Sequence, residues 1–174
     1  MTFNTTILPL AQAVEAKRLL VREPLRPLGE QTRWLFVEPN IDALLDGHIH
    51  FGLFPQTSSE KLIGIFAAGQ LLTLSRRLTK AKPDVEQIVG YEEVWALCPR
   101  TPKPGWRILG RFVDPGHFVA LRAWDKNALF RNYAKATSEV IGDWKELFGD
   151  RAPYSNADAG AYVGGVFRDV DEES

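Results

Sequence analysis

The sequence predicts an α+β domain in which an antiparallel sheet of about four strands packs against helices. Residues 106–124 have the character of two strands around a turn, and residues 126–148 carry apolar side chains at helical spacing. With 174 residues, of which 45% are hydrophobic, the chain can form one substantial core. We therefore expect one domain at 31–149, between an N-terminal helical arm and linker at 1–30 and a Gly-rich segment with an irregular acidic tail at 150–174.

The first elements are predicted from local composition. Helix-forming residues with spaced apolar side chains favour a helix over 8–21, which Pro24, Pro27 and Gly29 end. The run at 32–37 is rich in aromatic and β-branched residues, which favours a strand.

The middle of the chain is more ambiguous. Residues 39–47 predict a short helix that ends at Gly47. The alternating segment 48–54 suits either an edge strand or an extended loop. From Leu62 an apolar stripe predicts a buried helix to about Leu78, although 63–66 also suits a strand.

The second half is the clearest part of the sequence. Residues 91–97 and the two arms of the 106–124 hairpin predict three antiparallel strands. The helix at 126–148 follows, with Asp125 as its N-cap and Gly149 as its end.

The hairpin separates arginines from apolar residues when Pro115 and Gly116 form the tip of the loop. Leu109 then faces Arg122, and Arg107 faces Trp124. One face carries Arg107, Leu109, Arg111, Val113, Phe118, Ala120, Arg122 and Trp124. The other carries Trp106, Ile108, Gly110, Phe112, Val119, Leu121 and Ala123, which is a core face. A three-residue loop would slip the register and mix arginines into both faces, so the hydrophobic pattern favours the first register.

Charge and cysteine content narrow the function classes. The net charge of −1 gives no general reason to expect nucleic acid, but residues 98–126 hold six basic against two acidic side chains, a local charge of +4. The single cysteine, Cys98, excludes an intramolecular disulfide framework. We expect a cytoplasmic protein without membrane association, because the start of the chain lacks a basic leader and no apolar run reaches the ~20 residues of a membrane span.

Short motifs in the second half resemble a known family. Residues 94–97, 106–109 and 118–126 are similar to the three strands of the RelE/ParE family of small bacterial toxins, most of whose ribonuclease members cut messenger RNA. The predicted order of strand, two helices, three antiparallel strands and helix also resembles that family over residues 32–148. The resemblance implies a RelE-like fold, a toxin–antitoxin role with a cognate protein partner, and metal-free cleavage of RNA.

The resemblance carries a partial site. It implies Arg107, Lys126 and Tyr133 as catalytic candidates. The glutamate that some members use as a base matches Ala96, and the double lysine of the last strand is reduced to Asp125-Lys126. Cleavage through the 2′-hydroxyl needs an acid, a base and fixed cations around the phosphate.

From the residues themselves, the hairpin predicts an anion-binding face. Arg107, Arg111 and Arg122 would bind phosphate groups of RNA or another polyanion, and Trp124 would stack on a base.

The alternative is a non-enzymatic protein-interaction or homodimerisation domain. On that hypothesis the arginine stems cover apolar neighbours and their charged ends meet acids or Trp124. An arginine face open to solvent would favour RNA binding, whereas a covered face would favour interaction.

No cofactor and no metal are expected. His48 and His50 stand two residues apart without an acidic or cysteine partner placed by the sequence. Cys98 lacks a nearby histidine to activate it, which favours a packed thiol.

Overall fold

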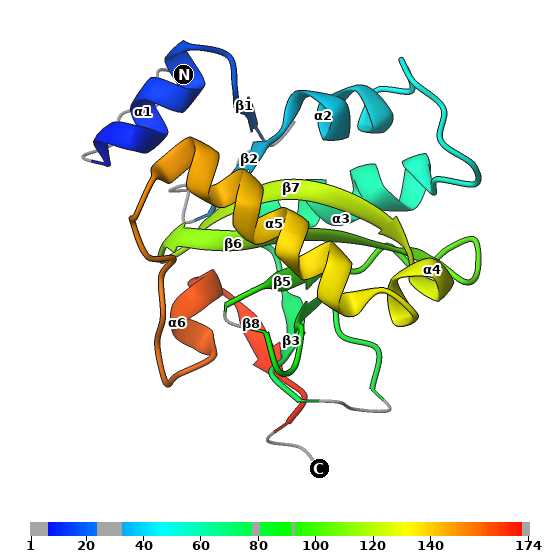
Figure 1. The fold of residues 1–174 in the computed structure, drawn as a ribbon. Helices are drawn as coiled ribbons and strands as arrows, with labels where there is room; N and C mark the ends of the chain where they lie inside the picture. The colour runs from blue at the N-terminus through cyan, green and yellow to red at the C-terminus, as the bar shows by residue number, and fades with distance from the viewer. Residues whose placement is uncertain (1–6, 24–32, 78–80, 92, 172–174) are drawn as a thin grey trace.

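The computed structural model describes residues 7–23, 33–77, 81–91 and 93–171. Eight strands form one mixed sheet that curls into a half-barrel, in the order β1-β2-β7-β6-β5-β4-β3-β8 (Figure 1). The strands are β1 (Leu20–Arg22), β2 (Trp34–Val37), β3 (Leu72–Ser75), β4 (Val85–Gln87), β5 (Trp95–Leu97), β6 (Trp106–Asp114), β7 (His117–Asp125) and β8 (Phe167–Asp169). The described helices are α1 (Leu8–Glu15), α2 (Pro39–Leu45), α3 (Gln56–Ala67), α4 (Lys126–Phe130), α5 (Tyr133–Phe148) and α6 (Gly160–Val163).

The predicted antiparallel sheet of about four strands is wrong, although the α+β class holds. β2 pairs in parallel with β7, and β3 pairs in parallel with both β4 and β8. The added strands β1, β3, β4 and β8 are only three or four residues long. β1 and β3 lie in runs that the apolar spacing assigns to helices, and β4 and β8 lie in segments where the sequence predicts no regular element.

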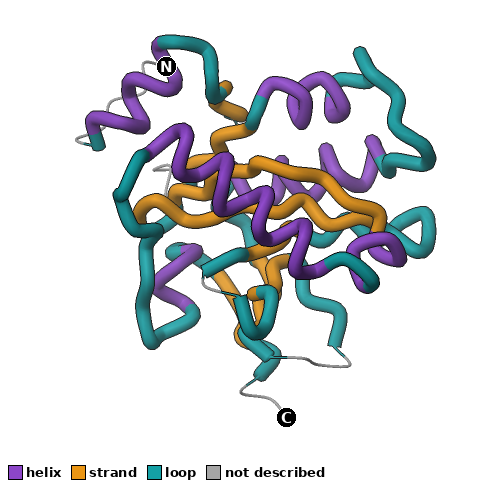
Figure 2. Tube along the Cα trace, viewed as in Figure 1, coloured by secondary structure: helices purple, strands orange, loops and turns teal. Residues whose placement is uncertain are grey.

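Helices cover both faces of the sheet (Figure 2). α2, α3 and α6 contribute to one apolar core, around Phe66, Trp95 and Phe112. α1, α4 and α5 contribute to a second core on the opposite face, around Leu109, Val119 and Trp144. Helices therefore cover at least part of each face of the central hairpin.

The hairpin of β6 and β7 has the predicted register at both ends and a different one in the middle. Leu109 faces Arg122 and Asp114 faces His117, but Phe112 faces Phe118 between them. Two irregularities, at Val113 and Leu121, absorb the one-residue shift. Phe118 and Ala120 consequently join the core away from the arginines, whereas the sequence pattern predicted them on the arginine face.

The predicted helix from Leu62 to about Leu78 is wrong from Ala68 to Arg77, and Leu78 lies outside the described residues. α3 ends where Gly69 adopts a φ of 69°, and the amide of Gln70 donates to the carbonyl of Ile65. The chain then continues as the buried strand β3. The first helix is likewise shorter than predicted, because α1 ends at Glu15 and β1 follows.

The last long helix is confirmed with one interruption. Asp125 caps α4 by accepting from the amides of Asn127 and Ala128, and α5 ends at Gly149, whose φ is 60°. A turn at 131–132 separates the two helices.

The predicted irregular C-terminal tail is also wrong. α6 and β8 belong to the fold, and Tyr162 is fully buried. The buried guanidinium of Arg33 donates to the carbonyls of Val163, Gly164 and Val166, which holds this segment against the start of β2. The predicted linker at 24–30 and the last acidic residues at 172–174 lie outside the described residues. None of the described helices is long and apolar enough to cross a bilayer.

Candidate functional site

The four predicted anion-binding residues lie on the face of the hairpin that α5 covers. Arg107 and Arg111 are each only 4% exposed. The Arg122 side chain is 43% exposed, and Trp124 is half-buried. The face is therefore covered over two of its three arginines.

Side chains of α5 engage the rest of this face. The Arg111 guanidinium lies 5.7 Å from the centre of the Trp144 ring. Arg122 donates from Nε and Nη2 to the two carboxylate oxygens of Asp143, at 2.5 and 2.8 Å. That hydrogen-bonded pair raises the pKa of Arg122. The Lys135 ammonium lies 6.0 Å from the Trp124 ring.

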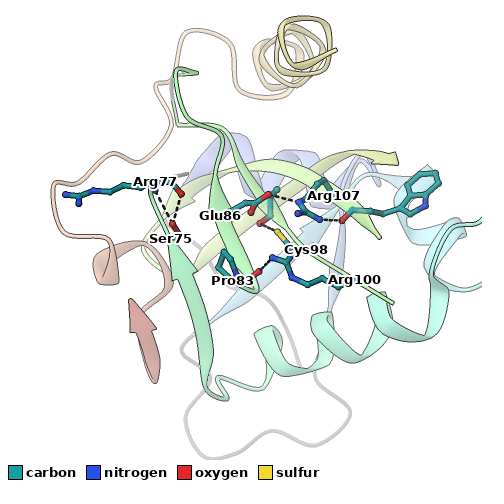
Figure 3. A network of polar contacts seen from close by, with 9 residues as sticks. Ser75, Arg77, Pro83, Glu86, Cys98, Arg100 and Arg107 are labelled. Atoms are coloured by element: carbon teal, nitrogen blue, oxygen red, sulfur yellow. Dashed lines mark hydrogen bonds and ion pairs between the residues drawn. The ribbon is translucent and has the colours of Figure 1, made fainter. Parts of the chain in front are cut away.

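Arg107, on β6, forms an ion pair with Glu86, on β4 (Figure 3). Its Nε lies 2.5 Å from Oε1 of Glu86, and its Nη1 donates to the carbonyl of Trp106. Glu86, on β4, stands directly opposite Ala96 on β5. A carboxylate thus lies on the strand beside Ala96, an arrangement that the sequence pattern did not predict.

Tyr133 joins this cluster and Lys126 does not. Burial, followed by the negative charge of Glu86, raises the pKa of Tyr133. Cys98 is buried beside the same ion pair, and its desolvation raises the pKa of its thiol far above the ordinary value. Lys126 is exposed at the start of α4, and no hydrogen bond or ion pair joins its side chain to the cluster in the described part of the chain. Nor do three metal-ligand side chains gather among the described residues.

A groove of about 670 Å³ lies between α2 and α5. β7 contributes Leu121, Arg122 and Ala123 to its lining, and the loop after α2 contributes Ile49 and Phe51. Phe51 is 64% exposed, which is unusual for an aromatic ring beside other apolar side chains. A volume of this size is in the range of binding sites for small molecules and short peptide segments.

An unpaired strand edge lies at this groove. β2 pairs with β7 only as far as Ala120, and the last contact is the Glu38 amide donating to the Ala120 carbonyl at 3.0 Å. There the chain turns away into α2. Among the described residues no strand pairs with β7 on this side beyond Ala120. The edge from Leu121 to Asp125 therefore has no partner strand within the described ranges, and its first three residues line the groove.

The register identifies which backbone groups the edge offers. The Lys126 amide donates to the carbonyl of Gly105, so the backbone groups of Lys126 point toward β6. In an antiparallel pair this orientation alternates, and the backbone groups of Trp124 and Arg122 therefore also point toward β6. The amide and carbonyl of Ala123, between them, point away from β6 and toward the groove. By this alternation Ala123 offers one donor and one acceptor to the groove, and no strand in the described part of the chain pairs with them.

Sequence reasoning missed this groove. The alternating segment 48–54, read as an edge strand or an extended loop, is a loop that exposes Phe51 and Leu53. Two exposed apolar side chains in a short segment are the signal that the sequence offered. The unpaired edge had no such signal, because it depends on where β2 ends relative to β7.

Comparison of the chain with protein-family models, with curated proteins and with solved structures finds no match. The site is therefore interpreted from its own geometry.

Proposed function

We propose that this chain is a protein-interaction domain that binds an extended segment of a partner polypeptide along β7. The observation that carries the proposal is the unpaired edge of β7 beyond Ala120, beside an apolar groove. An extended segment can add to such an edge as a strand, with main-chain hydrogen bonds for affinity and side-chain contacts for specificity. Residues 121–125 would pair with about five residues, or roughly 17 Å of extended chain.

The walls of the groove favour a single strand as its occupant. α2 and α5 stand on either side of the β7 edge (Figure 1). A single added strand needs less room between these two walls than the sheet of a second folded copy would need. The exposed Phe51 ring then provides an apolar surface for the segment to bury.

Binding of RNA or another polyanion through Arg107, Arg111, Arg122 and Trp124 remains a prediction. Burial of Arg107 and Arg111, together with the ion pairs to Glu86 and Asp143, favours the interaction alternative. Arginines that already meet acids inside the fold have few donors left for phosphate.

The proposal is tested with peptides selected from a displayed random library on the full chain. Binding of a labelled selected peptide is measured by fluorescence anisotropy. Ala123→Pro removes the amide that points into the groove and should weaken binding about tenfold or more, the equivalent of one or two hydrogen bonds. Because this amide makes no bond to β6, proline should leave the hairpin ladder intact.

A second pair of variants changes side chains of the loop after α2 and leaves the backbone of β7 unchanged. Phe51→Ser should also weaken binding, whereas Leu53→Ser should not, because Leu53 is 80% exposed on the same loop but does not line the groove. A selection that yields no binder, or binders that are indifferent to both Ala123→Pro and Phe51→Ser, would overturn the proposal.

A further inference from the structure

The two walls of the groove differ in chemistry. The wall formed by α2 and the loop after it is mainly apolar, with Ile41, Leu44, Ile49 and Phe51, and its polar side chains, Glu38 and Asn40, lie where α2 begins. The wall formed by α5 and the turn between α1 and β1 is mainly charged, with Lys17, Arg18, Asp143 and Glu146 beside Leu147. A ligand that fills the groove meets apolar surface on one side and polar surface on the other.

The two walls stand on opposite faces of the sheet. The Arg122 side chain leaves β7 toward α5, where it meets Asp143. The Ala123 side chain leaves it toward the core that contains Ile41 of α2. Side chains of a strand added beside β7 would follow the same alternation, one toward α2 and the next toward α5.

Charge on the α5 wall makes an apolar neighbour costly there. Glu146 is exposed, and the Arg122–Asp143 pair is partly exposed, so both retain water. Apolar side chains laid against them would remove that water without supplying hydrogen bonds. Opposite charges are both present on this wall, since Lys17 and Arg18 line it together with Glu146, and Arg122 pairs with Asp143. The wall therefore favours polar side chains and selects no single charge.

We infer that the partner segment is an amphipathic strand, in which apolar residues that face α2 alternate with polar residues that face α5. This inference rests on the proposed function and adds the class of segment that the groove accepts. A segment with its apolar residues in one block would place some of them against Glu146 and Asp143, and it would leave Phe51 partly uncovered.

The test uses two soluble synthetic peptides of identical composition. In one, valine alternates with serine, and in the other the valines form one block. The alternating peptide should bind the full chain about tenfold or more tightly in fluorescence anisotropy, a difference that corresponds to about 1.4 kcal/mol. A third peptide, with alanine in place of every serine of the alternating peptide, should bind more weakly than the alternating peptide.

Changing the charged wall provides the second arm. Glu146→Leu should raise affinity for the alanine-containing peptide severalfold, because it gives the α5 wall an apolar side chain. Lys145→Leu is the matched control, since Lys145 is exposed on the same helix and does not line the groove. Both positions are exposed, so neither change disturbs the core.

The outcomes separate this inference from the proposed function. Equal affinities for the alternating and blocked peptides, both lost in Ala123→Pro, would overturn the amphipathic pattern and leave strand binding in place. Affinities that Ala123→Pro does not change, or no binding of any peptide, would overturn both.

Discussion

The substitution Gly110→Ala tests the bulged register of the hairpin, on which the position of the groove depends. A Cβ atom at Gly110 would stand 1.9 Å from the carbonyl oxygen of Val119 and 2.8 Å from the Phe118 ring. The first neighbour is backbone, so β7 itself must move by more than an ångström. Gly110→Ala should therefore combine overpacking, at about 1–3 kcal/mol, with loss of about two ladder hydrogen bonds, at about 1 kcal/mol each. We expect a destabilisation of roughly 3–5 kcal/mol, a large part of the 5–15 kcal/mol typical of a domain.

The assay is equilibrium unfolding in urea, followed by tryptophan fluorescence. Gly142→Ala is the matched control: Gly142 is exposed within α5, and a Cβ there meets nothing within 4 Å. The same chemical change should stabilise that helix by about 0.5–1 kcal/mol. The two variants should thus shift the urea midpoint in opposite directions. If Gly110→Ala stays within about 1 kcal/mol of the parent, the close backbone approach and the bulged register are wrong.

The further predictions concern the cluster around Arg107. Glu86→Gln removes the negative charge that pairs with the Arg107 side chain, which is 5% exposed. It should destabilise the fold by about 2–3 kcal/mol. This value lies below the range for fully buried ion pairs because Glu86 keeps contact with water. The same variant should lower the pKa of Tyr133, read by ultraviolet titration against Tyr133→Phe, and an unchanged value would contradict the placement of the two groups. Since folding raises the pKa of Tyr133 above 10, its contribution to stability is fully present below pH 10 and is lost as the pH rises through the folded value. Cys98, 3% exposed, should resist a thiol-labelling disulfide reagent until urea unfolds the chain, and rapid labelling of the native protein would show that the thiol is accessible.

Local chemistry accounts for the elements that the sequence predicted well. Asp125 caps α4 through its own carboxylate, and Gly149 ends α5 through a positive φ that glycine adopts freely. The ends of the hairpin follow the two-residue period of β6 and β7, each nine residues long. These features depend on neighbours within a few positions, so composition and spacing reveal them.

Distant contacts account for the candidate site. Glu86 meets Arg107 because β4 pairs with β5, and the spacing of residues in the sequence does not show which strands pair. The arginine face was predictable as a cluster, but its cover was not, since Asp143 and Trp144 reach it from a helix that the sequence only showed to be amphipathic.

The sequence by itself determined that residues 106–124 form a hairpin and that an amphipathic helix follows it. Only the tertiary structure decided that both faces of that hairpin are covered, that two irregularities turn Phe118 and Ala120 away from the arginines, and that β7 extends beyond β2 into a groove. The physical reason is that backbone period and caps are set by neighbouring residues, whereas register, coverage and an unpaired edge are set by the packing of segments far apart in the chain.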